Sequence, residues 1–256
     1  MKKRLDVLLV ERGLAESRTQ AQALVMAGLV RGYDKPGQQV DEDADLEVKG
    51  RAPYVSRGGE KLAHALDAFG VDVHGLDCLD VGASTGGFTD VLLQRRAARV
   101  IALDVGYGQL HQRLRNDPRV TVLERTNARE LEELPFAPQR VVCDVSFISV
   151  RIALPPALRL AAHGWQALVL VKPQFEAGRE DVGKGGVVRD DAVRARVVRE
   201  VAEAALGWGA TVAGVVDSGL PGPKGNRELF LYLVQADHPT LPDDLDERIQ
   251  SAVAAG

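Results

Sequence analysis

Four titratable side chains stand at the borders of apolar segments that have the composition of buried β-strands. Asp144 closes the segment VVCD, Lys172 follows LVLV, and Glu228 precedes LFLYL. Lys61 lies near the start of a predicted helix in the segment SRGGEKL. Ligands of open α/β sheets bind beyond the carboxyl ends of the strands, where Asp144 and Lys172 would lie. Two lysines and two acids at one sheet edge therefore predict a reactive site, although each alone is more often a surface group.

A glycine-rich segment joins the first strand of the same region to the helix that follows it. Glycine allows a tight turn and a close approach of the backbone to a ligand, so the segment predicts a nucleoside site. The predicted contacts there are Asp80, Gly82, Ala83, Ser84, Thr85, Gly86, Gly87, Phe88 and Thr89. Asp104 ends the next strand, before Val105, and an acid at that place accepts hydrogen bonds from ribose hydroxyls. Asn127 and Ala128, just past the third strand, are predicted to contact the adenine edge.

Two details of this segment favour S-adenosylmethionine over a dinucleotide. The segment lacks the GxGxxG pattern, and the carboxylate of Asp80 would repel a pyrophosphate but attract a methionyl ammonium group. NAD binding and a glycine-rich turn without any nucleotide stay open as alternatives. We expect no metal site, because the sequence shows no cluster of metal ligands.

The four border residues fit one kind of methyl transfer. A ribose 2′-hydroxyl is a weak nucleophile, so its proton must leave while the oxygen attacks the methyl group. Lysine has an ordinary pKa of about 10.4, which burial and a neighbouring cation lower. We therefore predict Lys172 as the general base, with Lys61 as its cationic neighbour. Asp144 and Glu228 are expected to position the two amines.

Alternating apolar and amphipathic segments from residue 57 onward predict a doubly wound, mostly parallel, seven-stranded α/β sheet of the Rossmann-like class. The strands are expected as near-continuous apolar runs at residues 77–81, 99–104, 120–124, 140–145, 167–171, 210–217 and 229–235. The glycine-rich segment 178–186 fits either a mobile lid over the ribose or a solvated loop. The longest helix is predicted at 189–206, and Leu245, Ile249 and Val253 predict a short helix near the end.

Residues 1–50 predict a separate small α+β domain, followed by a linker at 51–55 and the catalytic domain at 56–256. Apolar residues at helical spacing predict a helix from Leu5, Ser17 fits the N-cap of a second helix, and strands are expected within 29–33 and 38–48. Residues 1–31 carry six basic and three acidic side chains, which suits phosphate contacts as well as a solvated surface. The predicted RNA contacts are Lys3, Arg4, Arg12, Ser17, Arg18 and Arg31.

Composition limits the remaining classes of protein. The net charge of −4 gives no global basic field. No apolar run approaches the roughly 18–20 residues that a membrane-spanning helix needs. The two cysteines, Cys78 and Cys143, stand in apolar runs and are expected to be buried free thiols. We therefore expect a monomeric, cytoplasmic protein without a membrane partner.

The segment from Asp80 to Thr89, together with VSFIS, VKPQFE and PGPKGN, resembles the TlyA family of bacterial ribosomal RNA methyltransferases, often called hemolysin A. The catalytic half is similar to the wider FtsJ group, whose 2′-O-methyltransferases use a Lys-Asp-Lys-Glu tetrad. By motif, that tetrad falls on Lys61, Asp144, Lys172 and Glu228. Residues 4–49 resemble the RNA-binding domain first described in small-subunit ribosomal protein S-four.

The resemblance covers nearly the whole chain and implies 2′-O-methylation of a cytidine in 23S ribosomal RNA, and in some members also in 16S ribosomal RNA. It implies ribosomal RNA and ribosomal subunits as partners. Two other functions stay open. One is an RNA-binding assembly factor without catalysis, and the other is the membrane-active hemolysin that the older family name suggests. The lack of a strongly basic amphipathic helix speaks against the second.

Overall fold

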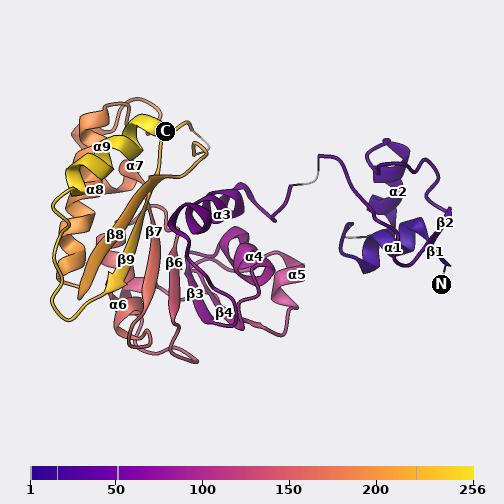
Figure 1. The fold of residues 1–256 in the computed structure, drawn as a ribbon, viewed down its shortest axis with the longest axis horizontal. Coiled ribbons are helices and arrows are strands. Elements are labelled where there is room, and N and C mark those ends of the chain that lie inside the picture. Colours follow the sequence, from indigo (N-terminus) through magenta and orange to yellow (C-terminus); the bar gives the residue numbers. More distant parts are fainter. Residues whose placement is uncertain (1, 16, 51, 223) are drawn as a thin grey trace. The chain divides into compact units, whose positions relative to one another are not determined.

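The computed structural model describes residues 2–15, 17–50, 52–222 and 224–256. The chain divides into two compact units, Met1–Ala52 and Pro53–Gly256 (Figure 1). One hydrophobic cluster fills the first unit, and two clusters fill the second. The linker predicted at residues 51–55 begins on Arg51, which lies outside the described residues.

Two short helices form most of the first unit. Helix α1 spans Leu5–Glu11 and helix α2 spans Arg18–Met26. The predicted N-cap of α2 is confirmed, because the side chain of Ser17 accepts a hydrogen bond of 3.2 Å from the backbone N–H of Gln20.

The strands of the first unit differ from the prediction. Strand β1 (Lys2–Arg4) pairs with β2 (Gln39–Asp41) in an antiparallel register. The sequence gives no sign of β1, since all three of its residues are basic. The strand expected within residues 29–33 is wrong, because Val30 makes only an isolated bridge to Val48.

Seven strands form the sheet of the second unit, in the order β5-β4-β3-β6-β7-β9-β8. Their bounds are β3 (Asp77–Val81), β4 (Arg99–Leu103), β5 (Val120–Leu123), β6 (Arg140–Cys143), β7 (Gln166–Val171), β8 (Ala210–Asp217) and β9 (Leu229–Gln235). Strands β3 to β7 pair in parallel, whereas β9 runs antiparallel to β7 and to β8. The predicted mostly parallel seven-stranded sheet is confirmed, and each predicted strand end lies within two residues of the observed one.

Helices cover both faces of this sheet (Figure 1). One face carries α3 (Arg57–Phe69), α4 (Gly87–Gln94) and α5 (Gln112–Arg115). The other carries α6 (Val150–Arg159), α8 (Asp191–Leu206) and α9 (Leu245–Ala255), while the short α7 (Pro173–Glu176) follows β7. Single-turn 3-10 helices occur at Ala128–Glu130 and Arg179–Asp181. The predicted helices at 189–206 and around Ile249 correspond to α8 and α9.

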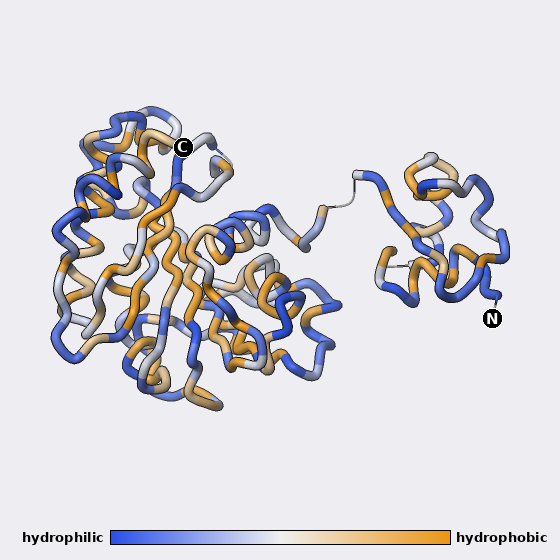
Figure 2. Tube along the Cα trace, viewed as in Figure 1, coloured by the Kyte–Doolittle hydropathy of each residue, from blue (hydrophilic) through white to orange (hydrophobic). Residues whose placement is uncertain are grey.

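The central strands of the sheet are largely apolar because both of their faces are buried (Figure 2). Successive residues alternate between the two hydrophobic clusters, so Cys78 packs toward α3 and α4 while Leu79 packs toward α6. Both cysteines are buried and free, as predicted.

The strand registers bring distant parts of the sequence to one edge of the sheet. Val81, at the end of β3, lies opposite Leu103 of β4 and Cys143 of β6. Val171, the last residue of β7, pairs with Leu229, the first residue of the reversed strand β9. The residues that follow β3, β4, β6 and β7 therefore share an edge with the residue that precedes β9.

We expect helix α9 to be a necessary part of the core. Ile249 is 1% exposed within the cluster that covers one face of the sheet. Its replacement in Ile249→Ala should lower the free energy of unfolding by about 2–4 kcal/mol, because the cavity left behind closes only in part. Urea unfolding measures this, with the neighbouring exposed Gln250→Ala as control, which should change stability by less than about 0.5 kcal/mol. Equal midpoints for the two variants would contradict this packing.

Candidate active site

Two adjoining cavities open at the carboxyl edge of the sheet. The first has a volume of about 230 Å³ and contains all four residues of the predicted tetrad, Lys61, Asp144, Lys172 and Glu228. The second has a volume of about 350 Å³ and lies over the ends of β3, β4 and β6. The two cavities share Gly82, Ser84, Asp144 and Ser146, so one elongated ligand can extend through both.

The tetrad is arranged as two ion pairs. The Nζ atom of Lys61 lies 2.5 Å from Oε2 of Glu228, whose other carboxylate oxygen accepts a hydrogen bond of 3.1 Å from Gln174. The Nζ atom of Lys172 lies 2.5 Å from Oδ1 of Asp144 and donates a hydrogen bond of 2.9 Å to the hydroxyl of Ser146. The four side chains predicted from motifs are therefore brought together.

Burial explains why each lysine needs an acid. Lys61 and Glu228 are 6% and 3% exposed, and an unpaired charge at such a position would cost several kcal/mol. Burial also raises the pKa of the Asp144 carboxyl, while the neighbouring Lys172 ammonium opposes that rise. Asp144 and Glu228 each hold one of the two amines, as expected, and Lys61 lines the same cavity as Lys172. The role of Lys61 as the cationic neighbour of Lys172 stays a prediction.

Close backbone packing places Lys61 in the cavity. A Cβ atom on Gly87, at the start of α4, would lie 2.8 Å from the backbone nitrogen of Gly59 in α3. A Cβ atom on Gly82, which has a φ of +89°, would lie 2.5 Å from the carbonyl oxygen of Asp144. These two positions require glycine, because any side chain would push α3 or the end of β6 away from the site.

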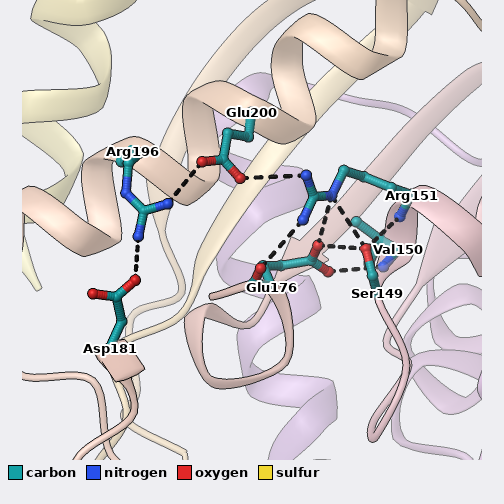
Figure 3. A network of polar contacts seen from close by, with 7 residues as sticks. All are labelled: Ser149, Val150, Arg151, Glu176, Asp181, Arg196 and Glu200. Atoms are coloured by element: carbon teal, nitrogen blue, oxygen red, sulfur yellow. Dashed lines mark hydrogen bonds and ion pairs between the residues drawn. The ribbon is translucent and has the colours of Figure 1, made fainter. Parts of the chain in front are cut away.

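A polar network fixes the two loops that carry Asp144 and Lys172 (Figure 3). The buried carboxylate of Glu176 accepts hydrogen bonds of 2.6 Å from the Ser149 hydroxyl and 2.7 Å from the Val150 backbone N–H. Arg151 bridges the Glu176 side chain at 3.3 Å and Glu200 of α8 at 3.3 Å. The loop after β6 is thereby joined to α7 and α8, which stiffens both sides of the Lys172–Asp144 pair.

The second cavity contains the residues predicted for the nucleoside. Asp104, Val105, Asn127 and Ala128 line it. The carboxylate of Asp104 accepts backbone hydrogen bonds of 2.7 Å from Ser84 and 2.6 Å from Gly106. Asp104 therefore shapes the loops around the cavity and also presents an acid inside it.

The glycine-rich segment divides into two groups. The residues that line the first cavity, the second or both are Gly82, Ala83, Ser84, Thr85, Gly87 and Phe88. Asp80, Gly86 and Thr89 line neither of them. The direct contact expected of Asp80 with an ammonium group is thus not supported, because this side chain is fully buried beneath the loop.

Asp80 instead holds the start of helix α4. Its Oδ2 atom accepts hydrogen bonds of 2.9 Å from the Thr89 backbone N–H and 2.7 Å from the Thr89 hydroxyl. Its Oδ1 atom is buried without a hydrogen-bond partner among the described residues. Burial raises the pKa of Asp80 to about 7.

Sequence reasoning missed Phe147, which also lines the second cavity. Its side chain is 92% exposed, its φ is +65°, and its ring centroid lies 5.1 Å from that of Phe175. A large aromatic residue in a left-handed conformation is strained, so an exposed ring held there is a candidate for ligand stacking. The VSFIS segment reads as a continuation of an apolar strand, and nothing in it shows that the chain turns at this residue.

The predicted RNA contacts of the first unit all have partners inside that unit. Lys3 pairs with Glu11 at 2.8 Å, and Arg31 pairs with Glu47 at 2.9 Å. Arg12 donates hydrogen bonds to the backbone carbonyls of Glu42 and Ala44. Ser17 caps α2, as described above.

The other two predicted contacts share a buried acid. Arg4 and Arg18 lie 3.0 Å and 2.9 Å from the carboxylate of Asp6. Hydrogen bonds from Arg4, Gln22 and Arg18 hold the pKa of Asp6 well below its usual range. These cations therefore stabilise the fold of the first unit, and their exposed parts remain accessible to a phosphate.

The described part of the chain offers neither a candidate metal site nor a helix that could span a membrane. It contains no group of three or more His, Cys, Asp or Glu side chains that could hold a metal ion. None of its helices is both long and apolar enough to cross a membrane.

Comparison with known proteins connects this geometry to a family. Residues 54–235 match the FtsJ-like methyltransferase family, and residues 3–31 match the S4 domain. The chain is 50% identical to the 16S/23S rRNA (cytidine-2′-O)-methyltransferase TlyA of Mycobacterium tuberculosis, over 99% of this chain and 98% of that protein. It is 39% identical to Hemolysin A of Brachyspira hyodysenteriae, over 90% of this chain and 99% of that protein.

A solved structure supports the same likeness. It is the structure of a Streptococcus thermophilus protein that is named as a hemolysin. Its sequence is 42% identical to this chain, and the two structures superpose with a TM-score of 0.75. The match covers 98% of this chain and 95% of that one. The likeness therefore includes both units of the chain.

The buried Asp80 carboxyl generates a pH prediction. Its pKa in the folded chain, about 7, lies above the ordinary value of 3.8, so the folded chain keeps a proton that the unfolded chain has lost between these pH values. The contribution of the protonated Asp80 carboxyl to the free energy of unfolding is fully present below about pH 4 and is lost as the pH rises through about 7. The total loss is up to roughly 4 kcal/mol. Asp80→Asn keeps an acceptor for Thr89 and has no proton to lose.

Urea unfolding without cofactor at pH 5 and pH 7.5 tests this. The parent protein should lose more stability than Asp80→Asn across that interval, and the variant should match or exceed the parent at pH 7.5. The same loss of stability in both proteins would show that Asp80 is ionised throughout.

Proposed function

The chain belongs to the FtsJ-like methyltransferase family, and from that premise we propose that it methylates the 2′-hydroxyl of a cytidine ribose in ribosomal RNA. The observation that carries the proposal is the pair of lysine–acid contacts in one cavity that adjoins a second, nucleoside-sized cavity. The relative from Mycobacterium tuberculosis, which is named for this activity, supports the choice of substrate.

The two cavities fit S-adenosylmethionine. Gly82 lets the backbone pass where a Cβ atom would clash, and Asp104 places a carboxylate in the second cavity, where ribose hydroxyls could donate to it. We propose that Asn127 and Ala128 lie along the adenine, and that the first cavity holds the methionyl end. When bound, S-adenosylmethionine supplies an electrophilic methyl group.

Lys172 is our candidate for the general base. Its amine is held by Asp144 and Ser146, which leaves one of its three N–H directions for the substrate. An amine accepts a proton only when it is neutral. Because burial raises the pKa of Asp144, moving a proton from the Lys172 ammonium to that carboxylate costs less than it would in water. The freed amine can then take the proton of the ribose 2′-hydroxyl.

The second ion pair has a positioning role in this proposal. Glu228 fixes Lys61 from one side, and Gln174 fixes Glu228 from the other. The Lys61 ammonium can then donate a hydrogen bond to the 2′-oxygen and hold it in line with the methyl group. Alignment of this kind contributes strongly to a direct displacement reaction.

In this proposal both units of the chain contribute contacts to the RNA. The first unit, which matches the S4 domain in part, docks on the ribosomal RNA of a ribosomal subunit. The exposed ring of Phe147 stacks on the base of the target nucleotide. We propose a cytidine in 23S ribosomal RNA as the target and one in 16S ribosomal RNA as a second target, since the similar Mycobacterium tuberculosis protein is named for both.

The base assignment predicts that Lys172→Ala and Lys172→Arg both abolish methyl transfer while S-adenosylmethionine still binds. Arginine keeps the positive charge, but its guanidinium does not give up its proton in a protein. Transfer of labelled methyl from S-adenosylmethionine to ribosomal subunits and to naked ribosomal RNA measures the rate. We expect a loss of at least about a hundredfold, which is the usual contribution of a general base. Substantial activity of Lys172→Arg would reduce Lys172 to a positioning residue.

The cofactor assignment predicts a different effect for Asp104→Ala. Loss of a charged hydrogen-bond acceptor should weaken the binding of S-adenosylhomocysteine by about ten- to a hundredfold, since such bonds contribute about 1.5–3 kcal/mol. Calorimetric titration measures the affinity. Asp77→Ala is the matched control, because Asp77 begins β3 at the opposite edge of the sheet. Equal affinities for the two variants would remove Asp104 from the cofactor site.

A further inference from the structure

Two loops meet beside the tetrad and are joined by one buried side chain. The first loop contains residues 183–189, before α8, and the second contains residues 218–222 and 224–228, between β8 and β9. Asn226 is 3% exposed, accepts a hydrogen bond of 3.0 Å from the Val188 backbone N–H and donates one of 2.8 Å to the carbonyl of Gly186. The two loops are thereby held as one surface.

This surface contains a strongly basic hollow of about 300 Å³. Its charged lining residues are Arg189, Lys224, Arg227 and Arg194. The first three are exposed, and none of them forms an ion pair with any described residue. The predicted RNA contacts Arg4 and Arg18, in contrast, share the acid Asp6.

Arg194 marks the hollow as a site for an anion. This residue of α8 is 7% exposed, pairs with Asp191, and donates a hydrogen bond of 2.9 Å to the carbonyl of Arg189. Its Nε and Nη1 atoms are buried and have no hydrogen-bond partner in the described ranges. Unsatisfied buried donors of a cation are costly, and an anion in the hollow would reduce that cost.

One loop contributes residues both to the hollow and to the cavity that contains the tetrad. Arg227 and Glu228 are consecutive residues, and Arg227 lines the hollow while Glu228 lines the first cavity. In the same loop, Pro221 lines the first cavity and accepts a hydrogen bond of 2.7 Å from Arg57. The hollow and the cavity of the tetrad therefore have this loop in common.

We propose that this hollow binds a backbone phosphate of the RNA strand close to the methylated nucleotide. The proposal rests on the proposed function and names one part of its substrate site. The charge favours a phosphodiester, and no aromatic side chain lines the hollow among the described residues, so the contact holds the backbone and not a base. Such a contact fixes the register of the strand, which sets the ribose that reaches Lys172.

The test uses the full-length double variant Lys224→Ala/Arg227→Ala, with a 23S ribosomal RNA transcript as the probe. We expect the KM for RNA to rise about tenfold. The plot of log affinity against log salt should become shallower by about 0.7, because one neutralised phosphate of a single strand contributes about that much to the slope.

The matched control is Arg199→Ala/Arg248→Ala. It removes the same charge from two arginines that already pair with acids, Arg199 with Glu203 at 3.0 Å and Arg248 with Asp244 at 2.9 Å. The control should keep the KM and the salt slope of the parent, and circular dichroism melts check that both variants fold. Equal behaviour of the two double variants would overturn the phosphate site.

The outcomes separate this proposal from the proposed function. Ribose methylation by the parent, with an unaffected Lys224→Ala/Arg227→Ala variant, would overturn the phosphate site alone. A salt slope that depends on these two residues, without any methyl transfer by the parent, would overturn the proposed function and leave the site standing. Binding of inorganic phosphate, measured at constant ionic strength, separates the two sources of the anion. Phosphate that binds the parent but not the Lys224→Ala/Arg227→Ala variant, while both proteins keep the same KM for RNA, would assign the hollow to the free ion and overturn its role for RNA.

Discussion

The buried ion pair between Lys61 and Glu228 joins the start of helix α3 to the start of strand β9, across 167 residues of sequence. Neither charge could be buried without the other, because an unpaired ion in such a place costs several kcal/mol. Their meeting depends on the one strand that reverses the direction of the sheet. Since β9 runs antiparallel to β7, the residue before β9 lies at the carboxyl edge of the parallel strands. Had β9 been parallel, Glu228 would lie at the opposite edge, and Lys61 would have no acid there.

Asp144, Lys172 and the nucleoside cavity lie at the same edge of the sheet. Asp144 and Lys172 follow two neighbouring parallel strands, and the Glu176 network holds the loops on which they stand (Figure 3). Two balanced ion pairs give a cavity without a large net charge. In the proposed reaction one pair supplies the base, since Asp144 takes the proton that frees the Lys172 amine, and the other holds the ribose oxygen in line.

Much of the sheet could be predicted from the sequence, because buried parallel strands are continuous apolar runs and their ends are marked by polar residues such as Asp104 and Lys172. Strand β1 could not, since its three basic residues form an exposed edge whose pairing depends on β2, more than thirty residues away. The tetrad followed from motifs, but the pairing of each lysine with its acid depends on strand direction, which the sequence does not display. Likewise, a carboxylate before a glycine-rich loop fits a ligand contact as well as a buried anchor, and only the packing of Thr89 shows that Asp80 is an anchor.

The central claim concerns the atom that receives the methyl group, and alkaline hydrolysis of the product RNA tests it most directly. A 2′-O-methyl group blocks cleavage at its own nucleotide, because the free 2′-hydroxyl is the attacking group in that hydrolysis. After transfer from labelled S-adenosylmethionine, we predict that the label is recovered in an alkali-resistant dinucleotide that begins with cytidine. Label recovered in mononucleotides would place the methyl group on a base and contradict the account.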